Sequence, residues 1–507
     1  MPMHASNDPL TTARRATVLV ATLAVGLAAA RAVEPLPAPE PAAEVLPACP
    51  LEHAPTGPYA GMTPDPAVIA VGAGGCATAS CHGGPAAGNH GVHSFAARLW
   101  AERDPHARAY ATLHDPRSRK MAALLGIGAA HQAEQCLACH STQASCGSPL
   151  PPAVLADGVA CGSCHGDATR WVAVHHLPEW KQLDQEARAE LGYRELSDAR
   201  SRVRTCIPCH VGDASREVDH DMIAAGHPRL AFEFAAYQRL WPRHWSPHGR
   251  AEAAADFAER SWAVGQAETL AAVARLLEVR ARRAVDAADA AADRDAPQQR
   301  GGRWPEFAEF DCYACHRALS PERVAGAAAG PFANPAPGTP SWQPWSVAAA
   351  ELLAAAVDDP SVAAVGPAAK ELRAAFEPGW AAAGHDRLER TRALARALEI
   401  TAEDATRALE ARGTIVLEAA PRRLDAVIAA DRAGWRTWDA AAQTYLLMDA
   451  ALDGGPAHLG LWHSASPPTD TRAALDELRA SLRFPPGAGG PDGFDPARFE
   501  RDRAGVR

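Results

Sequence analysis

The stretch "CLACHSTQASCGSPLPPAVLADGVACGSCHG", residues 136–166, contains two Cys-x-x-Cys pairs with 21 residues between them. This spacing is close to that of a zinc ribbon, in which four thiolates hold one metal ion. Each pair is also followed directly by a histidine, His140 or His165. Cys-x-x-Cys-His is the attachment pattern of c-type haem, in which the histidine ligates the iron. Taken alone, the stretch fits both kinds of site.

The same pattern recurs along the chain and decides between the two. Regular motifs end at His140, His165, His210 and His316, and a longer variant, "CATASCH", spans residues 76–82. A zinc ribbon gives no reason for a histidine after every second cysteine, whereas haem attachment requires one. With 21 histidines in 507 residues, four such coincidences have a probability of about 10⁻⁶. The sequence therefore predicts five haem c sites. At the longer variant, the alternative is a disulfide between Cys76 and Cys81.

These motifs account for ten of the twelve cysteines. The predicted thioether-forming residues are Cys76, Cys81, Cys136, Cys139, Cys161, Cys164, Cys206, Cys209, Cys312 and Cys315. The predicted proximal iron ligands are His82, His140, His165, His210 and His316. Cys49 and Cys146 remain, and we expect a disulfide between them because free thiols tend to oxidise in an exported protein.

The second axial ligand of each iron decides between electron transfer and substrate binding, because an open position allows chemistry. Eleven further histidines lie between residues 90 and 248. We expect ligands at His106, which follows a proline, and at one of the adjacent His175 and His176, with His175 preferred. We also expect them at His220 and His227, which share a face if the segment is helical. A second group of candidates comprises His93, which we include among the ligands, and His114, His131, His244 and His248.

Several segments together resemble the multihaem c-type cytochromes related to cytochrome c554. They are "CATASCHGG", "DPHARAY", "CLACH", "DGVACGSCHG", "CIPCH", "HDMIAAGHPRLAFEFAAY" and "FAEFDCYACH", within roughly residues 66–320. The resemblance implies haems packed in close pairs, two histidine ligands at most irons, and electron transfer. It also implies that His106, His175, His220 and His227 are second ligands. Where related sequences often have a histidine after the last motif, this chain has Arg317.

The leading functional hypothesis is an exported electron carrier, because candidate ligands outnumber the irons. Its partners would be donor and acceptor proteins, including a membrane complex on which the C-terminal helices would dock. The alternative is a multihaem oxidoreductase of small nitrogen or sulfur compounds, similar to hydroxylamine oxidoreductases or nitrite reductases. One haem would then be open, with Arg243, Arg317, His244 or His248 orienting an anion. A net charge of −10 and the lack of phosphate-binding motifs argue against nucleic-acid partners. Neither enzymatic activity nor the oligomeric state follows from the sequence.

Composition divides the chain into six segments. Residues 1–32 read as a signal peptide, cleaved before Val33 to give a periplasmic protein, or retained as an N-terminal anchor. A Pro/Ala-rich linker at 33–65 precedes a multihaem domain at 66–324. A second linker at 325–340 leads to a helical domain at 341–484 and a disordered tail at 485–507.

The abundance of alanine and the absence of period-two patterns predict a mainly α fold. We expect a multihaem cytochrome c core with short helices and loops around stacked haems, plus a C-terminal helical region. One long amphipathic helix at 262–292 should lay its apolar face against the haems. The helices expected beyond it are 345–357, 368–376, 386–400, 402–412, 421–451 with a break near Gly434, and 471–482.

Overall fold

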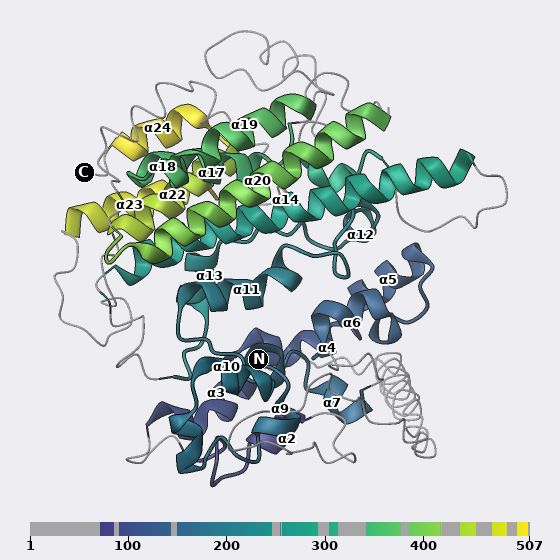
Figure 1. Cartoon of the computed structure of the whole chain (residues 1–507), viewed down its shortest axis with the longest axis vertical. Coiled ribbons are helices and arrows are strands. Elements are labelled where there is room, and N and C mark those ends of the chain that lie inside the picture. The colour runs from purple at the N-terminus through teal and green to yellow at the C-terminus, as the bar shows by residue number, and fades with distance from the viewer. Residues whose placement is uncertain are drawn as a thin grey trace, which may run out of the picture. The chain divides into compact units, whose positions relative to one another are not determined.

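The computed structural model describes residues 71–85, 91–142, 150–245, 254, 256–292, 304–312, 341–376, 385–415, 417, 437–452, 469–483 and 494–504. Helices dominate these residues, which confirms the predicted mainly α class (Figure 1). Their only β pairing is two isolated bridges, Gly166 with Tyr193 and Phe310 with Trp342. Among them, no helix combines the length and the apolar character needed to cross a bilayer. The predicted signal peptide, both linkers, Cys49, Cys146, Cys315 and His316 lie outside the described residues.

The region of the haem motifs is built from short helices, as the sequence predicted. They are α2 (Ala73–Cys76), η2 (Val92–Phe95), α3 (Ala96–Arg103), η3 (Pro105–Arg108), α4 (Ala109–Thr112), α5 (Pro116–Leu125), η4 (Ala130–Gln132), α6 (Glu134–His140), α7 (Pro152–Ala156), α8 (Cys161–His165), α9 (Ala168–Trp171), η5 (Pro178–Gln182), α10 (Gln185–Glu190), α11 (Ala199–His210), α12 (His220–Ala225), α13 (Phe234–Leu240) and η7 (Phe307–Glu309). Aspartates begin many of them, because their carboxylates accept the unpaired N–H groups of the first turn. Examples are Asp167, Asp184, Asp198 and Asp219.

Three of these helices end at a motif histidine. The last residues of α6, α8 and α11 are His140, His165 and His210. Within a helix, the two cysteines of each motif are three residues apart and therefore lie on one face. The helix ends thus present both thiols and the following imidazole to the same side of the chain.

The C-terminal helices pack around one long helix, α14 (Phe257–Ala292). The others are α17 (Pro344–Ala356), α18 (Pro360–Ala363), α19 (Val365–Phe376), α20 (His385–Ala411), α22 (Trp438–Leu452), α23 (Thr469–Ser481) and α24 (Pro496–Ala504). Helices α14 and α20 run side by side (Figure 1). Trp262 and Leu277 of α14 are fully buried in this core. Complete burial of such a side chain contributes roughly 1.5–3 kcal/mol.

Three expectations for these helices are wrong. Helix α14 is buried on nearly all sides between α11, α13 and the C-terminal helices, and none of its described residues lines the large cavity described below. Helix α20 runs unbroken through Ile400, where we expected two helices, because Leu398, Ala402 and Ala405 continue one buried stripe. The tail predicted to be disordered contains α24, whose Phe499 is fully buried.

Polar contacts join the C-terminal helices to the region of the haem motifs. The indole Nε1 of Trp345 donates to the Phe232 carbonyl at 3.1 Å. Arg239 pairs with Asp449 at 2.5 Å, and Arg200 pairs with Glu410 at 2.7 Å. In agreement with these contacts, residues Cys49–Arg507 form one compact unit.

Candidate haem sites

A large cavity joins the second, third and fourth motifs. Its volume is about 1420 Å³, above the roughly 300–1,000 Å³ of a typical small-molecule site. Five motif cysteines and four of the histidines singled out above line it: Cys136, Cys139, Cys164, Cys206, Cys209, His106, His140, His210 and His227. Attachment groups and candidate ligands therefore converge on one space that is large enough for more than one macrocycle.

Each described motif histidine faces a second histidine from elsewhere in the chain. The distances between ring centroids are 6.2 Å for His82–His175, 6.4 Å for His140–His227, 6.2 Å for His165–His244 and 6.0 Å for His210–His106. The rings are nearly parallel in the first pair, at 17°, and steeply inclined in the other three, at 76° to 88°. Four motifs thus yield four pairs with almost the same separation.

This separation fits an iron atom between the rings. With metal–nitrogen bonds of about 2.0 Å and about 1.1 Å from nitrogen to ring centre, two imidazoles across one iron have centroids about 6 Å apart. His114 and His131 provide a contrast, because their rings stack at 4.3 Å and leave no room for a metal. His175 and His176 also lie 5.9 Å apart, but they are adjacent in the chain, so the spacing is informative only for the four pairs that join distant segments.

Hydrogen bonds select the tautomer that a metal requires. The Nδ1 atoms of His82, His140, His175 and His227 donate to backbone carbonyls at 2.7–3.0 Å. A ring that donates through Nδ1–H keeps the lone pair of Nε2 free, and such partners also orient a ligating imidazole. Burial acts in the same direction, because it lowers the pKa of His175, His227 and His244, and that of His210 to about 4. These rings are neutral at physiological pH.

His106 is held by a buried carboxylate. Its Nδ1 lies 2.9 Å from Oδ1 of Asp104, whose Oδ2 accepts from the Trp241 indole at 2.7 Å. Burial alone would raise the pKa of Asp104, but hydrogen bonds from His106 and Trp241 outweigh it and lower that pKa. The His106 carbonyl accepts from Val159 at 3.1 Å, next to Gly158 at φ +67°, where a Cβ would lie 2.7 Å from that carbonyl oxygen. A side chain at position 158 would displace His106.

The thiols of the opening stretch do not form a four-thiolate site. Cys139 lies beside Cys209, and Cys161 lies beside Cys76. In the part of the chain that the structure describes, no three His, Cys, Asp or Glu side chains converge as ligands of one bare metal ion. The contacts instead bring the first motif beside the third and the second beside the fourth. No disulfide joins any two of the described cysteines, including Cys76 and Cys81, the pair for which a disulfide was the alternative.

The described part of the fifth motif lies near His220. Cys312 follows η7, and the ring of Phe307 in η7 contacts His220 at 5.3 Å. The backbone N–H of His220 donates to Glu306 at 2.9 Å. This places His220 next to the segment that leads into the fifth motif.

Some of the second ligands predicted from the sequence face a motif histidine in the structure, and others do not. His106, His175 and His227 each face a motif histidine, whereas His93 contributes its backbone carbonyl to His82 rather than its ring. His220 and His227 do not share a helical face, because α12 ends at Ala225 and Gly226 has φ +124°, so the condition for that face is not met. The residue missing from the predicted ligand set is His244, which faces His165. Its neighbour Pro242 was no usable signal, because other candidate histidines also have a proline within three residues.

The comparison with known families agrees with this geometry. The family model described as cytochrome c554 and c-prime matches residues 77–166 and 160–226. No curated protein and no solved structure is similar enough to the chain to count as a match. The matched segments include the first motif from Ala77 onward, the next three motifs in full, and the histidines at 106, 175 and 220, and they end one residue before His227. Over residues 77–226, the chain therefore resembles the cytochrome c554 family.

Proposed function

We propose that this protein is an exported electron carrier with five covalently attached haems. The observation that carries the proposal is the set of four histidine pairs at 6.0–6.4 Å, each joining a motif histidine to a second imidazole. Haem bound there supplies a one-electron Fe(III)/Fe(II) couple. With two histidines per iron, no coordination position would remain for a substrate. The paired histidines would keep the same two ligands on the iron in both oxidation states.

The residues proposed as ligands are those of the four pairs, together with His316 and His220 at the fifth motif. His220 is chosen because it lies beside η7, directly before Cys312. The thioether residues are the ten motif cysteines. Contacts between Cys76 and Cys161, and between Cys139 and Cys209, support close spacing of the attachment sites. Cys164 of the third motif and Cys206 of the fourth line the same cavity, which also supports close spacing of these two sites.

The surroundings of the pairs suit electron transfer. Five of the eight paired imidazoles are held by backbone carbonyls or by Asp104, so little rearrangement of these rings accompanies a change of iron charge. Export to the periplasm is proposed from the signal-like residues 1–32. Donor and acceptor proteins are then the expected partners, with the C-terminal helices as a docking element for one of them.

Carbon monoxide tests whether every iron is closed. We expect the visible spectrum of the dithionite-reduced protein to stay unchanged when carbon monoxide is added, because two imidazoles occupy each iron. A change in about a fifth of the Soret absorbance would mean one open iron among five and would favour the oxidoreductase alternative. Myoglobin under the same conditions provides the positive control.

Intact mass tests the number of haems. We expect the purified protein to carry five haem masses on a polypeptide that begins at Val33. In the double variant Cys76→Ser/Cys81→Ser, one haem mass should be lost, because the thioethers of the first motif can no longer form. An equal mass increment in wild type and variant would remove the first motif from the proposal. Retention of residues 1–32 would replace the soluble exported form by an anchored one.

A further inference from the structure

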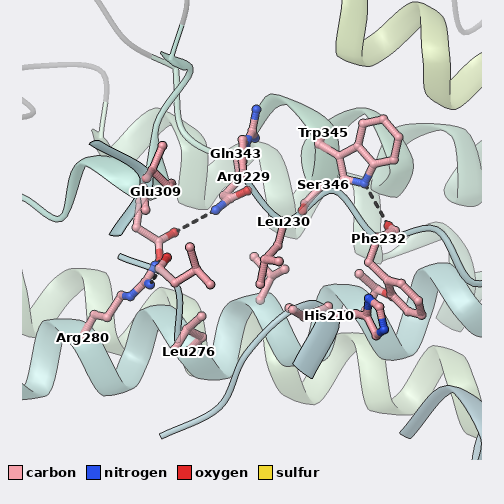
Figure 2. Close-up of a pocket in the computed structure, with 16 residues that line it drawn as sticks. His210, Arg229, Leu230, Phe232, Leu276, Arg280, Glu309, Gln343, Trp345 and Ser346 are labelled. Atoms are coloured by element: carbon pink, nitrogen blue, oxygen red, sulfur yellow. Dashed lines mark hydrogen bonds and ion pairs between the residues drawn. The ribbon is translucent and has the colours of Figure 1, made fainter. Parts of the chain in front are cut away.

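A second, smaller cavity lies behind His210, on the side of the C-terminal helices. Its volume is about 60 Å³, and residues of α11, α14, η7 and α17 line it. Figure 2 shows His210 at one end and the ion pair of Arg280 and Glu309 toward the other. A water molecule needs about 10–15 Å³ of such space and two or more polar partners. The cavity is large enough for a few water molecules, and two polar groups in its lining can form hydrogen bonds with them.

The first partner is the imidazole of His210. Six of the other seven paired histidines place Nδ1 against an oxygen atom of the protein. For His210, no described residue forms a hydrogen bond with either ring nitrogen. Ligating histidines almost always donate their second N–H to a carboxylate, a carbonyl or water. In His210, water in the adjoining cavity is the acceptor that the structure leaves room for.

The second partner is the hydroxyl of Thr269 in α14. This residue is 6% exposed, lines the cavity, and its Oγ1 has no hydrogen-bond partner among the described residues. Other helical threonines bond the carbonyl four residues earlier, namely Thr205, Thr401, Thr406 and Thr444. A buried hydroxyl without a partner costs about 1–3 kcal/mol. Thr269 lacks the bond within its own helix that these other threonines form, and it lines the same cavity as His210.

We infer that water held by the Thr269 hydroxyl accepts the hydrogen bond of His210 Nδ1–H, which makes Thr269 a positioning residue for the fourth-motif iron. An imidazole that donates a hydrogen bond is a more basic ligand and stabilises Fe(III) over Fe(II). Water does this less strongly than the Asp104 carboxylate does for His106 on the other side of the pair. This inference rests on the proposed haem at Cys206 and Cys209.

The test compares two substitutions of nearly equal size. Thr269→Val removes the hydroxyl and keeps the shape, whereas Thr269→Ser keeps the hydroxyl. We expect Thr269→Val to raise the reduction equilibrium constant of one haem about threefold, which is about 30 mV for a one-electron couple. Thr269→Ser should titrate like the wild type. Asp104→Asn, which weakens the hydrogen bond of the opposite ligand, identifies the component of the spectroelectrochemical titration that belongs to this haem.

Thr406→Val is the matched control, because Thr406 is also a buried helical threonine but donates to a carbonyl of its own helix. It should leave every potential unchanged. Two results would overturn the inference: unchanged potentials in Thr269→Val, or the same shift in Thr269→Ser. If the cavity is dry, Thr269→Val removes a buried unpaired hydroxyl, and its thermal midpoint should exceed that of the wild type. That result would also count against the inference. Absence of haem from the fourth motif, visible in the intact mass, would refute the proposed function instead.

Discussion

An alanine in place of His244 is expected to give the protein one iron that binds carbon monoxide. His244 faces His165 at 6.2 Å, and its loss leaves the opposite side of the third-motif iron without an imidazole. An open haem is high-spin when oxidised and takes up carbon monoxide when reduced. We expect both signals from one of the five haems, with the other four unchanged, in visible spectra recorded before and after the addition of the gas.

The control is His131→Ala, because His131 stacks on His114 at 4.3 Å and faces no motif histidine. Its spectrum should match that of the wild type. His244→Met should remain closed to carbon monoxide, with a raised potential, because a thioether replaces the imidazole. If His244→Ala binds no carbon monoxide while retaining all its haems, another group ligates the third-motif iron and the pairing is wrong.

The attachment residues were predictable from the sequence because their chemistry is local. Two thioethers and one axial ligand must fit one porphyrin, so both cysteines and the histidine lie within a few residues of each other. The structure adds that α6, α8 and α11 end at these histidines, which the motif alone does not specify. The covalent requirement fixes the spacing along the chain without fixing the neighbours in space.

The second ligands were harder to predict because each comes from a distant segment. His244 is 79 positions from His165, and His175 is 93 positions from His82. All four second ligands have a proline within three residues, as do His114 and His248, so this signal does not discriminate. Only tertiary contacts distinguish His244 from the other candidates.

The helical class of the C-terminal region followed from its composition, but the packing of α14 did not. The sequence suggested one apolar face, because alanine is small and ambiguous between surface and core. In the structure, Ala263, Ala267, Ala271 and Ala274 form one buried stripe, which lets α20 and other helices approach closely, and Ala272, Leu276 and Val279 are buried on the opposite side of the helix. The same helix buries a charged residue, Arg280. The sequence predicts neither this burial nor the carboxylates that pair with the guanidinium.

Replacement of Arg280 is expected to cause the largest loss of stability. Its Nη1 lies 2.6 Å from Glu309 and its Nε 3.0 Å from Glu217, with side-chain exposures of 7% for Arg280 and 1% for Glu309. Burial would lower the pKa of Arg280, but the charges of Glu309 and Glu217 outweigh it and raise that pKa. Arg280→Met leaves a buried carboxylate unpaired. Such a loss costs about 3–5 kcal/mol, measurable as a lowered urea midpoint of helical circular dichroism.

Arg275 provides a control on the same helix, because its side chain is 50% exposed and pairs with Glu399 and Glu403 at the surface. Arg275→Met should cost no more than about 1 kcal/mol. The double variant Arg280→Met/Glu309→Gln should recover part of the loss, because the charge left unpaired by the first change is then removed. Equal midpoints for Arg280→Met and Arg275→Met would mean that water reaches Glu309. The ion pair would then not be the contact that holds η7 and the approach to the fifth motif against α14.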